Sequence, residues 1–536
     1  MAPEKDLVAT PGDPAPGPPP TSGPDPDVEA TATSTSGPGK NGDDDDDALA
    51  MVGAHAQPYD PAVAARAVRQ IDRFLVPAMV FGYGLVYYDK AILGSAVLFG
   101  MTADLRLSVP VPGGGVDTSR LSWATSLFYF GMLAGLYPMT YALQRFPPGR
   151  TLGAVVLAWA AACASTAAVS DHRGLYAQRF ALGFVESAVP TGFMCVVAGY
   201  YTQAEQSLRQ SWWFSATGLF TIIGGGLNYA FAQVPSSSAR GNGGRLRPWQ
   251  SIYILAGCLT FLFGVACFFL PASPVSAWFL TPEERFAAVE RLRRGQTGVR
   301  CAKFKPHQLR EAVADAKVWL VALMMASAYT MNGAVSGFGP LIVSTFGWSP
   351  LQAILLQFPL GAVCFAVILL TGYLGSRLPN ARVVMLVACC LPVIAGCALV
   401  WRADWSRRAA APVVGYSLTG FFGGVVSLVI SLGMSNVAGH TKKSFVAATV
   451  FVAYCVGNIV GPQLVRSQSR ARHYPELWTG LIVCYVICVL AAAALYRLLR
   501  AENRRRDALP VDEEERAKLA FQDLTDKENP YFRYVY

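Results

Sequence analysis

The chain has 536 residues, of which 53% are hydrophobic and only 15% are charged, with a net charge of +9. Soluble domains carry about 25% charged residues, so this composition excludes an ordinary soluble enzyme or binding module. Apolar runs of about 20 residues recur, and each can cross a ~30 Å hydrocarbon core as a helix whose backbone is hydrogen-bonded internally. The sequence therefore predicts an all-α membrane protein, because it lacks the residue alternation of a membrane β-barrel.

Residues 1–60 are rich in Pro, Gly, Ser, Thr and Asp, and they include the run Asp43–Asp47. Such a composition cannot bury a core, so we expect a disordered N-terminal tail. The tail has no signal-peptide apolar region, so the first apolar run must direct membrane insertion. Gly39-Lys40 lacks the glycine spacing and the following Ser or Thr of a phosphate loop, which disfavours an ATP-driven pump; no cofactor is predicted.

Twelve apolar runs follow this tail and are the expected transmembrane helices. They cover residues 74–98, 121–142, 151–169, 175–200, 210–233, 250–270, 318–346, 351–374, 383–401, 411–435, 444–465 and 477–496. The predicted organisation is an N-terminal six-helix half (61–270), a central loop (271–317), a C-terminal six-helix half (318–496) and a C-terminal tail (497–536).

Basic residues are divided unevenly between the two sides of the predicted membrane. Twelve spans put both termini on one side, where 24 Lys and Arg residues flank the membrane, against twelve in the opposite loops. This bias predicts that both termini and the central loop are cytoplasmic, although the outer loop Pro235–Pro248 carries three arginines. The net positive charge therefore needs no nucleic acid as a partner.

The central loop contains a helix start, with Thr281 as N-cap and Pro282 at the first helical position. We expect this helix to lie along the membrane surface. Four of its arginines would then lie near lipid headgroups, namely Arg285, Arg291, Arg293 and Arg294.

Eleven of the twelve cysteines lie in the predicted spans, and the twelfth, Cys301, lies in the central loop. None lies in an outer loop, so no disulfide is expected. The five histidines all lie outside the spans, and the cysteines do not show the paired spacing of a zinc site. We therefore predict no metal site and no histidine proton relay within the membrane.

Four charged residues lie inside the apolar runs: Asp89 and Lys90 in the first, and Arg179 and Glu186 in the fourth. A charge at the bilayer centre costs roughly 2.5–3.5 kcal/mol on insertion scales, so intramembrane charges are functional candidates by default. Arg179 and Glu186 are seven residues apart, which places them on one helix face. The set favours an anion site with a proton-carrying acid; the alternative for Arg179 and Glu186 is a purely structural ion pair.

Asp89 and Lys90 are adjacent, so their side chains diverge by ~100° around the helix. We interpret Lys90 as a substrate contact and Asp89 as a second proton-coupling candidate. The alternative is a partly hydrated pair near the end of the first helix.

Uncharged polar residues in the spans can complete a binding cavity by donating hydrogen bonds to a carboxylate. The candidates are Tyr87, Asn228, Tyr329, Asn332, Gln357 and Asn458. A single Asn or Tyr in a span more often forms an interhelical hydrogen bond, and that alternative stays open for each.

The two halves repeat one loop pattern. Arg145 and Arg150 follow the second span, and Arg377 and Arg382 follow the eighth, with 232 residues between equivalent positions. Two parallel six-helix repeats are the plan of major facilitator transporters. The loops resemble the signature of the major facilitator superfamily, Gly-x-x-x-Asp-Arg followed by a distal Arg. The resemblance implies that these arginines belong to cytoplasmic gating loops, but Gln144 and Ser376 replace the aspartates of the signature.

A closer resemblance is to the fungal allantoate permease group of the anion:cation symporters. It rests on Tyr88-Asp-Lys-Ala-Ile-Leu-Gly94, Phe99-Gly-Met-Thr-Ala-Asp104, Arg179-Phe-Ala-Leu-Gly183-Phe-Val-Glu186, Gly457-Asn-Ile-Val-Gly-Pro-Gln463 and the tail Thr525-Asp-Lys-Glu-Asn-Pro-Tyr-Phe-Arg-Tyr-Val535. In related symporters the residue at Arg179 holds the substrate anion, the residue at Glu186 binds the proton, and an arginine stands at Lys90.

The resemblance implies a secondary active transporter for proton-coupled uptake of a small organic anion, such as allantoate, nicotinate, pantothenate or another carboxylate. We expect a monomer in the plasma membrane that works by alternating access. The alternatives are a metabolite exporter of the same fold and a non-transporting nutrient sensor. A membrane enzyme is disfavoured, because the sequence offers no nucleophile–base set and no metal set.

Overall fold

The computed structural model describes residues 59–111, 115–146, 148–233, 246–271, 273–294, 305–378, 380–405, 409–508 and 524–536. Most of the predicted N-terminal tail and Cys301 lie outside these residues. The first half comprises α2 (Pro61–Ala96), η1 (Val97–Met101), α3 (Thr102–Asp104), α4 (Ser119–Arg145), α5 (Pro148–Ser165), η2 (Thr166–Ala168), α6 (His172–Glu186), α7 (Ala188–Tyr200), α8 (Gln203–Phe214), α9 (Ala216–Ala232) and α10 (Pro248–Cys267).

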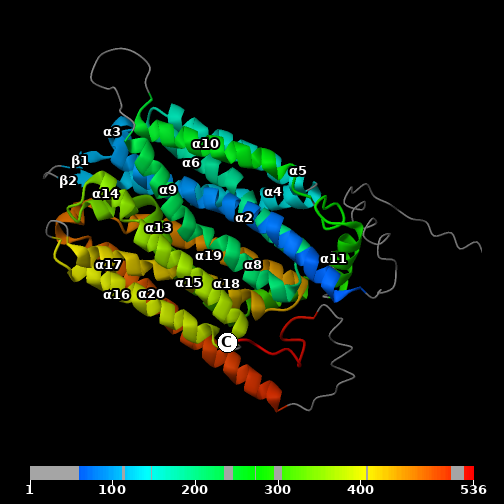
Figure 1. The fold of residues 1–536 in the computed structure, drawn as a ribbon. Helices are drawn as coiled ribbons and strands as arrows, with labels where there is room; N and C mark the ends of the chain where they lie inside the picture. The colour runs from blue at the N-terminus through cyan, green and yellow to red at the C-terminus, as the bar shows by residue number, and fades with distance from the viewer. Residues whose placement is uncertain are drawn as a thin grey trace, which may run out of the picture. The chain divides into compact units, whose positions relative to one another are not determined.

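The second half comprises α13 (Ala316–Ser344), α14 (Pro350–Leu355), α15 (Phe358–Arg377), α16 (Arg382–Arg402), α17 (Ala410–Leu418), η3 (Thr419–Phe421), α18 (Phe422–Ser435), α19 (His440–Gln463), η4 (Ser467–Arg472) and α20 (Pro475–Asp507). Between the halves lie α11 (Pro282–Arg294) and α12 (Pro306–Val313). Every predicted span coincides with one helix or with consecutive helices. Figure 1 shows the blue-to-green helices of the first half beside the yellow-to-red helices of the second.

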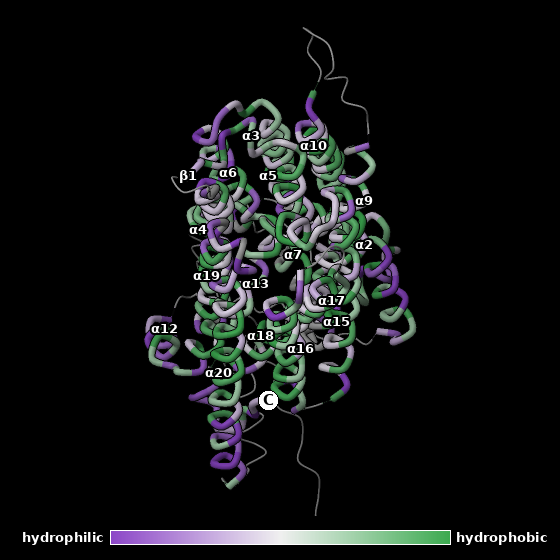
Figure 2. The backbone as a smooth tube through the Cα atoms, turned by 90° about the vertical axis from the view of Figure 1, so that its left-hand side faces the viewer, coloured by the Kyte–Doolittle hydropathy of each residue, from purple (hydrophilic) through white to green (hydrophobic). Residues whose placement is uncertain are grey.

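Eight helical stretches among the described residues are long and apolar enough to cross a membrane. The other four predicted spans are all in the first half and correspond to α2, α4, α6–α7 and α8–α9. Two of them correspond to pairs of consecutive helices, which are separated at Ser187 and at Ser215, and α2 carries Asp89 and Lys90. Figure 2 shows hydrophobic residues along most helices and hydrophilic residues along the last turns of α20.

Close helix packing in the first half depends on glycine. A Cβ on Gly183 of α6 would collide with the backbone carbonyl of Phe128 in α4. Small residues let neighbouring membrane helices approach to backbone contact, which is the main way in which they associate in lipid. This contact fixes how α6 presents Arg179 and Glu186 to the rest of the half.

The halves meet through α4 and α19. Ser122 Oγ donates to the carbonyl oxygen of Pro462 at 3.0 Å, and Ser126 Oγ donates to that of Ile459 at 3.1 Å. These carbonyls lie near the end of α19, where Pro462 interrupts regular helical bonding. At the same end, a short hairpin pairs β1 (Val109–Val111) antiparallel with β2 (Gly115–Asp117), with Val109 opposite Asp117.

The central-loop helix α11 begins at the predicted residue, and two of its arginines have partners within the protein. The amide of Glu284 donates to Thr281 Oγ1, and the Glu284 carboxylate accepts the Thr281 amide, which makes a capping box. Arg291, expected near lipid headgroups, forms an ion pair with Glu205 at 2.7 Å. Arg285 donates to the carbonyls of Ala277 and Leu280. Both guanidiniums therefore have hydrogen-bond or ion-pair partners within the protein.

Residues 524–536, here called the C-terminal clasp, return to the second half after α20. Asp526 is fully buried and forms ion pairs with Lys442, at 2.8 Å, and with Lys317. Asn436 and Val535 exchange two hydrogen bonds of 2.8 Å. Arg506 of α20 donates to the carbonyls of Asp526 and Phe532. Part of the predicted tail thus joins α13, α19 and α20.

Candidate functional site

A buried ion pair joins α2 to α6. Lys90 Nζ lies 2.7 Å from Glu186 Oε1; the Glu186 side chain is fully buried and that of Lys90 is 9% exposed. Lys90 also lies over the ring of Phe128, 5.3 Å from its centroid. Glu186 is the final residue of α6, directly before the break at Ser187. Lys90 and Glu186, predicted for different roles, therefore meet in one place.

Arg179 does not pair with Glu186, so the structural pair considered for these two residues is not formed. Its Nη2 donates to the hydroxyl of Tyr253 in α10, and its guanidinium lies over the Tyr253 ring, 5.6 Å from the centroid. The side chain is buried, and its Nε has no hydrogen-bond partner. Among the described residues, no carboxylate forms an ion pair with Arg179. It is therefore a buried cation with donor capacity left for an anion.

Asp89 points away from Lys90, as their spacing predicts. Its carboxylate accepts hydrogen bonds from Trp159 Nε1 at 2.9 Å and from Cys163 Sγ at 3.4 Å, both on α5. Asp89 is buried, with 2% of its surface exposed. The alternative of a partly hydrated Asp89–Lys90 pair is therefore wrong, because each side chain has its own buried partner.

Three of the uncharged candidates line one small cavity between the halves: Tyr87 of α2, Asn228 of α9 and Gln357, which lies just before α15. The cavity measures about 30 Å³ and also contacts α13. A volume of about 10–15 Å³ holds one water molecule, so the cavity is too small for an organic anion. The described conformation is therefore closed around these residues.

The polar candidates also bond to one another or to neighbouring helices. Asn228 accepts from the Tyr88 hydroxyl at 2.8 Å and donates to Ser95 Oγ at 2.9 Å. Gln357 Oε1 accepts from the Tyr416 hydroxyl at 2.8 Å. These are the interhelical hydrogen bonds that the sequence left open as an alternative. In this closed conformation these bonds occupy the polar groups that a substrate would need as hydrogen-bond partners.

The remaining candidates lie between α13 and α19. Asn332 Nδ2 donates to Asn458 Oδ1 at 2.8 Å, and Tyr329 packs edge-on against Tyr454 with ring centroids 4.4 Å apart. Tyr454 also contacts Tyr129 of α4 with ring centroids 5.8 Å apart. This group therefore reaches across the interface between the halves.

The direct partners of the charged residues cannot be read from the sequence. Tyr253 binds Arg179, and Trp159 binds Asp89. Both are polar aromatics within predicted spans, which is the only local signal they carry. Their importance comes from helix neighbours that no spacing along the chain reveals.

The four arginines of the predicted gating loops differ in their contacts and exposure. Arg382 Nη1 donates to Ser435 Oγ at 2.7 Å, and Arg377 lies over the Tyr373 ring, 5.5 Å from its centroid. The side chains of Arg145 and Arg150 are exposed.

The family model described as the Major Facilitator Superfamily matches residues 79–462. An uncharacterized transporter of Schizosaccharomyces pombe is 32% identical over 480 residues, which cover 89% of this chain and 90% of that protein. The thiamine pathway transporter THI73 of Saccharomyces cerevisiae is 31% identical over 88% of this chain and 86% of its own. The allantoate permease of the same yeast is 30% identical over 87% and 85%.

Solved structures agree on the fold. The proton:xylose symporter XylE matches with a TM-score of 0.59 at 14% identity, over 81% of this chain and 96% of the symporter. A bacterial homologue of the lysosomal transporter Spinster, in an inward-facing conformation, gives 0.55 at 14% identity, over 79% and 96%. The chain belongs to the Major Facilitator Superfamily, and its named relatives include the allantoate permease that its motifs resemble. It is a multi-pass membrane transporter and not an enzyme.

Proposed function

We propose that the protein imports a small organic anion together with a proton, as a monomer in the plasma membrane, by alternating access. The observation that carries the proposal is Arg179, a buried cation without a carboxylate partner among the described residues. A buried charge left without a counterion is costly. An organic anion is the ligand that would remove this cost.

Charge balance supports coupling to a proton. In their usual ionised forms, Asp89, Lys90, Arg179 and Glu186 sum to zero. An entering anion would add one negative charge to this buried group, and a proton on Glu186 would restore the balance. Because low-dielectric surroundings penalise net charge, anion and proton are expected to bind together.

The Lys90–Glu186 pair supplies a mechanism for this coupling. When Glu186 takes up a proton, its attraction for Lys90 falls and the ammonium becomes available to the substrate carboxylate. Arg179 can then hold the anion through two parallel N–H···O bonds, while lysine offers a compact charge. Release of the proton would re-form the pair and expel the anion, which links the two cargoes in either direction of transport.

Uptake of labelled organic acids into proteoliposomes tests the proposal. The panel includes allantoate, nicotinate and pantothenate, with and without an inwardly acidic pH gradient, and efflux from loaded vesicles is measured in parallel. Uptake that rises with the gradient supports proton symport. Gradient-independent transport would reject the coupling, and a complete lack of transport with measurable binding would favour the sensor alternative.

A further inference from the structure

A groove lies between α16 and α20, where the apolar part of α20 gives way to its charged end. It measures about 570 Å³, within the range of small-molecule sites. Its apolar lining includes Val384 and Val387 of α16 and Ala493 of α20, and Val384 is 65% exposed. In a membrane we expect the apolar part of the groove to lie at hydrocarbon level and its charged end to lie near the membrane–water interface.

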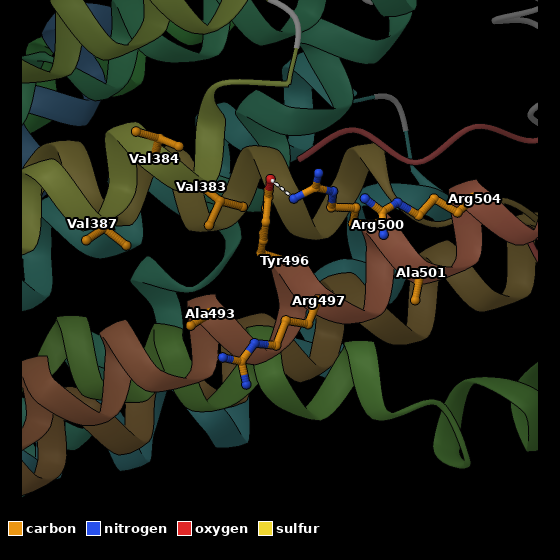
Figure 3. Close-up of a pocket in the computed structure, with 9 residues that line it drawn as sticks. All are labelled: Val383, Val384, Val387, Ala493, Tyr496, Arg497, Arg500, Ala501 and Arg504. Atoms are coloured by element: carbon orange, nitrogen blue, oxygen red, sulfur yellow. Dashed lines mark hydrogen bonds between the residues drawn. The ribbon is translucent and has the colours of Figure 1, made fainter.

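Three arginines line the charged end of this groove: Arg497, Arg500 and Arg504. Their spacing of three and four residues places them along one side of α20. In Figure 3 the side chains of Arg500 and Arg504 lie beside each other, and Arg497 points away from them. Arg500 donates to the Tyr496 hydroxyl at 3.3 Å, which orients its guanidinium along the groove.

Other arginines on this helix and in the C-terminal clasp are already paired. Arg505 and Arg506 bind Glu502, and Arg533 binds Asp507. Within the described ranges, no carboxylate forms an ion pair with Arg497, Arg500 or Arg504. The arginines without an ion pair among the described residues are therefore the ones that line the apolar groove.

We propose that this groove binds one anionic glycerophospholipid, with its phosphate at Arg500 and Arg504 and an acyl chain along Val384, Val387 and Ala493. Guanidinium groups bind phosphate oxygens through paired hydrogen bonds. Basic pockets between membrane helices bind acidic headgroups in this way. The apolar lining of the groove matches an acyl chain, which a free phosphate lacks, so the occupant is a lipid.

Such a lipid would connect α16 with α20 at the end where Arg382 begins α16. The site is separate from the buried charges of the proposed transport site. Its test therefore depends on neither the substrate nor the direction of transport.

The experiment measures retention of lipids by the purified full-length protein in detergent, by native mass spectrometry. The probes are dioleoyl phosphatidylserine and dioleoyl phosphatidylcholine. The wild type is expected to retain one phosphatidylserine in preference to phosphatidylcholine. The variant R500Q/R504Q should bind phosphatidylserine about 25-fold more weakly, since each basic residue near an anionic headgroup is worth about fivefold.

The matched control is R466Q/R470Q, which removes two exposed arginines at η4 and makes the same change in charge. It should leave phosphatidylserine retention unchanged, and equal losses in both variants would reduce the effect to nonspecific charge and overturn the site. Val384→Trp fills the groove without changing charge, at a position exposed enough to accept the larger side chain. Val384→Trp should also weaken phosphatidylserine retention. If R500Q/R504Q melts at a lower temperature than the wild type, the result for Val384→Trp is the test of the site.

Two further arms separate the possible ligands. Glycerophosphoserine, which has no acyl chains, should compete poorly; competition as strong as that of the lipid would overturn the role of the groove. The acidic run Asp512–Glu515 is the intramolecular alternative to a lipid as the anion that binds the arginines. If phosphatidylserine binds only after these four residues are changed to amides, the arginines serve that run and the lipid proposal is wrong.

Discussion

Lys90 Nζ and Glu186 Oε1 lie 2.7 Å apart, in a pair that joins the second half of the first predicted span to the break in the fourth. The pair cancels one negative and one positive charge in a region with almost no exposure to solvent. Arg179, two turns from Glu186 on α6, is left without such a partner among the described residues. The difference between these two cations forms the basis of the first three predictions.

Glu186→Gln should reduce uptake driven by a pH gradient more than tenfold. Counterflow exchange of substrate should persist, because the amide imitates the protonated acid and leaves Lys90 free to bind the anion. The measurement is uptake and exchange in proteoliposomes, with Glu283→Gln, at an exposed position of α11, as the matched control. Gradient-driven uptake equal to that of the wild type would rule out Glu186 as the coupling acid.

Arg179→Ala should raise the KM for the transported anion more than Arg179→Lys, because the alanine variant loses both the charge and the paired donors. Lys90→Arg should be tolerated better than Lys90→Ala. Tyr253→Phe should have a smaller effect than either change at Arg179, since it removes only the hydroxyl that orients the guanidinium. Identical KM values across the series would reject a two-cation clamp.

Lys90→Ala leaves Glu186 buried without a counterion, which costs about 3–5 kcal/mol. The double variant Lys90→Ala/Glu186→Gln should recover most of the lost melting temperature, because neither charge then remains. Thermal unfolding monitored by size-exclusion fluorescence measures this cycle. Additive losses in the double variant would show that the two residues do not interact energetically.

The contribution of the buried Asp526 carboxylate to stability should not change with pH in the physiological range. Burial alone would raise the pKa of Asp526, but Lys317 and Lys442 lower it from the ordinary 3.8 to about 2. A depressed folded-state pKa means that the stability contribution is present above the ordinary pKa and is lost as pH falls through the folded value. The melting temperatures of the wild type and Asp526→Asn should therefore differ by a constant amount between pH 5 and 8.

The same pair of proteins tests the clasp itself. Asp526→Asn leaves two lysines with fewer counterions and should destabilise the second half by several degrees, whereas Asp507→Asn, at an exposed position, should have little effect. A melting temperature unchanged by Asp526→Asn would mean that the clasp does not stabilise the folded protein.

The charge bias makes a prediction about orientation. In a background without native cysteines, Ser237→Cys should react with an impermeant thiol reagent on intact cells, and Ser276→Cys should not. Labelling after permeabilisation provides the control for reactivity. The reverse pattern would place both termini and the central loop outside the cell.

The sequence predicts the twelve helical regions well, because length and hydropathy are local properties of the chain. It also identifies the four buried charges, since a charge in an apolar run is conspicuous. It does not predict that Glu186 pairs with Lys90 and not with Arg179. Spacing gives the face of one helix only, and the neighbour of that face is decided by contacts such as Gly183 against Phe128.

The clasp shows the same limit over a longer distance. Residues 525–535 resemble a family motif, but a charged segment after the last span carries no local sign that it will be buried. Its partners Lys317 and Lys442 lie on two different helices of the second half. Only the tertiary arrangement of those helices makes a pocket of positive charge that Asp526 can enter.

Asp526 also sets an order of events during synthesis. Every helix of both halves precedes Asp526 in the chain. Lys442 and Lys317 therefore lack one of their counterions until translation has passed all twelve spans. During that interval Lys442 depends on Glu311 and Asp315, which are already made. The first half can complete its own packing early, whereas the second half reaches its final charge pairing only after residue 526 has left the ribosome. A translational pause or premature stop after α20 would therefore yield a chain with all its membrane helices and an unfinished second half.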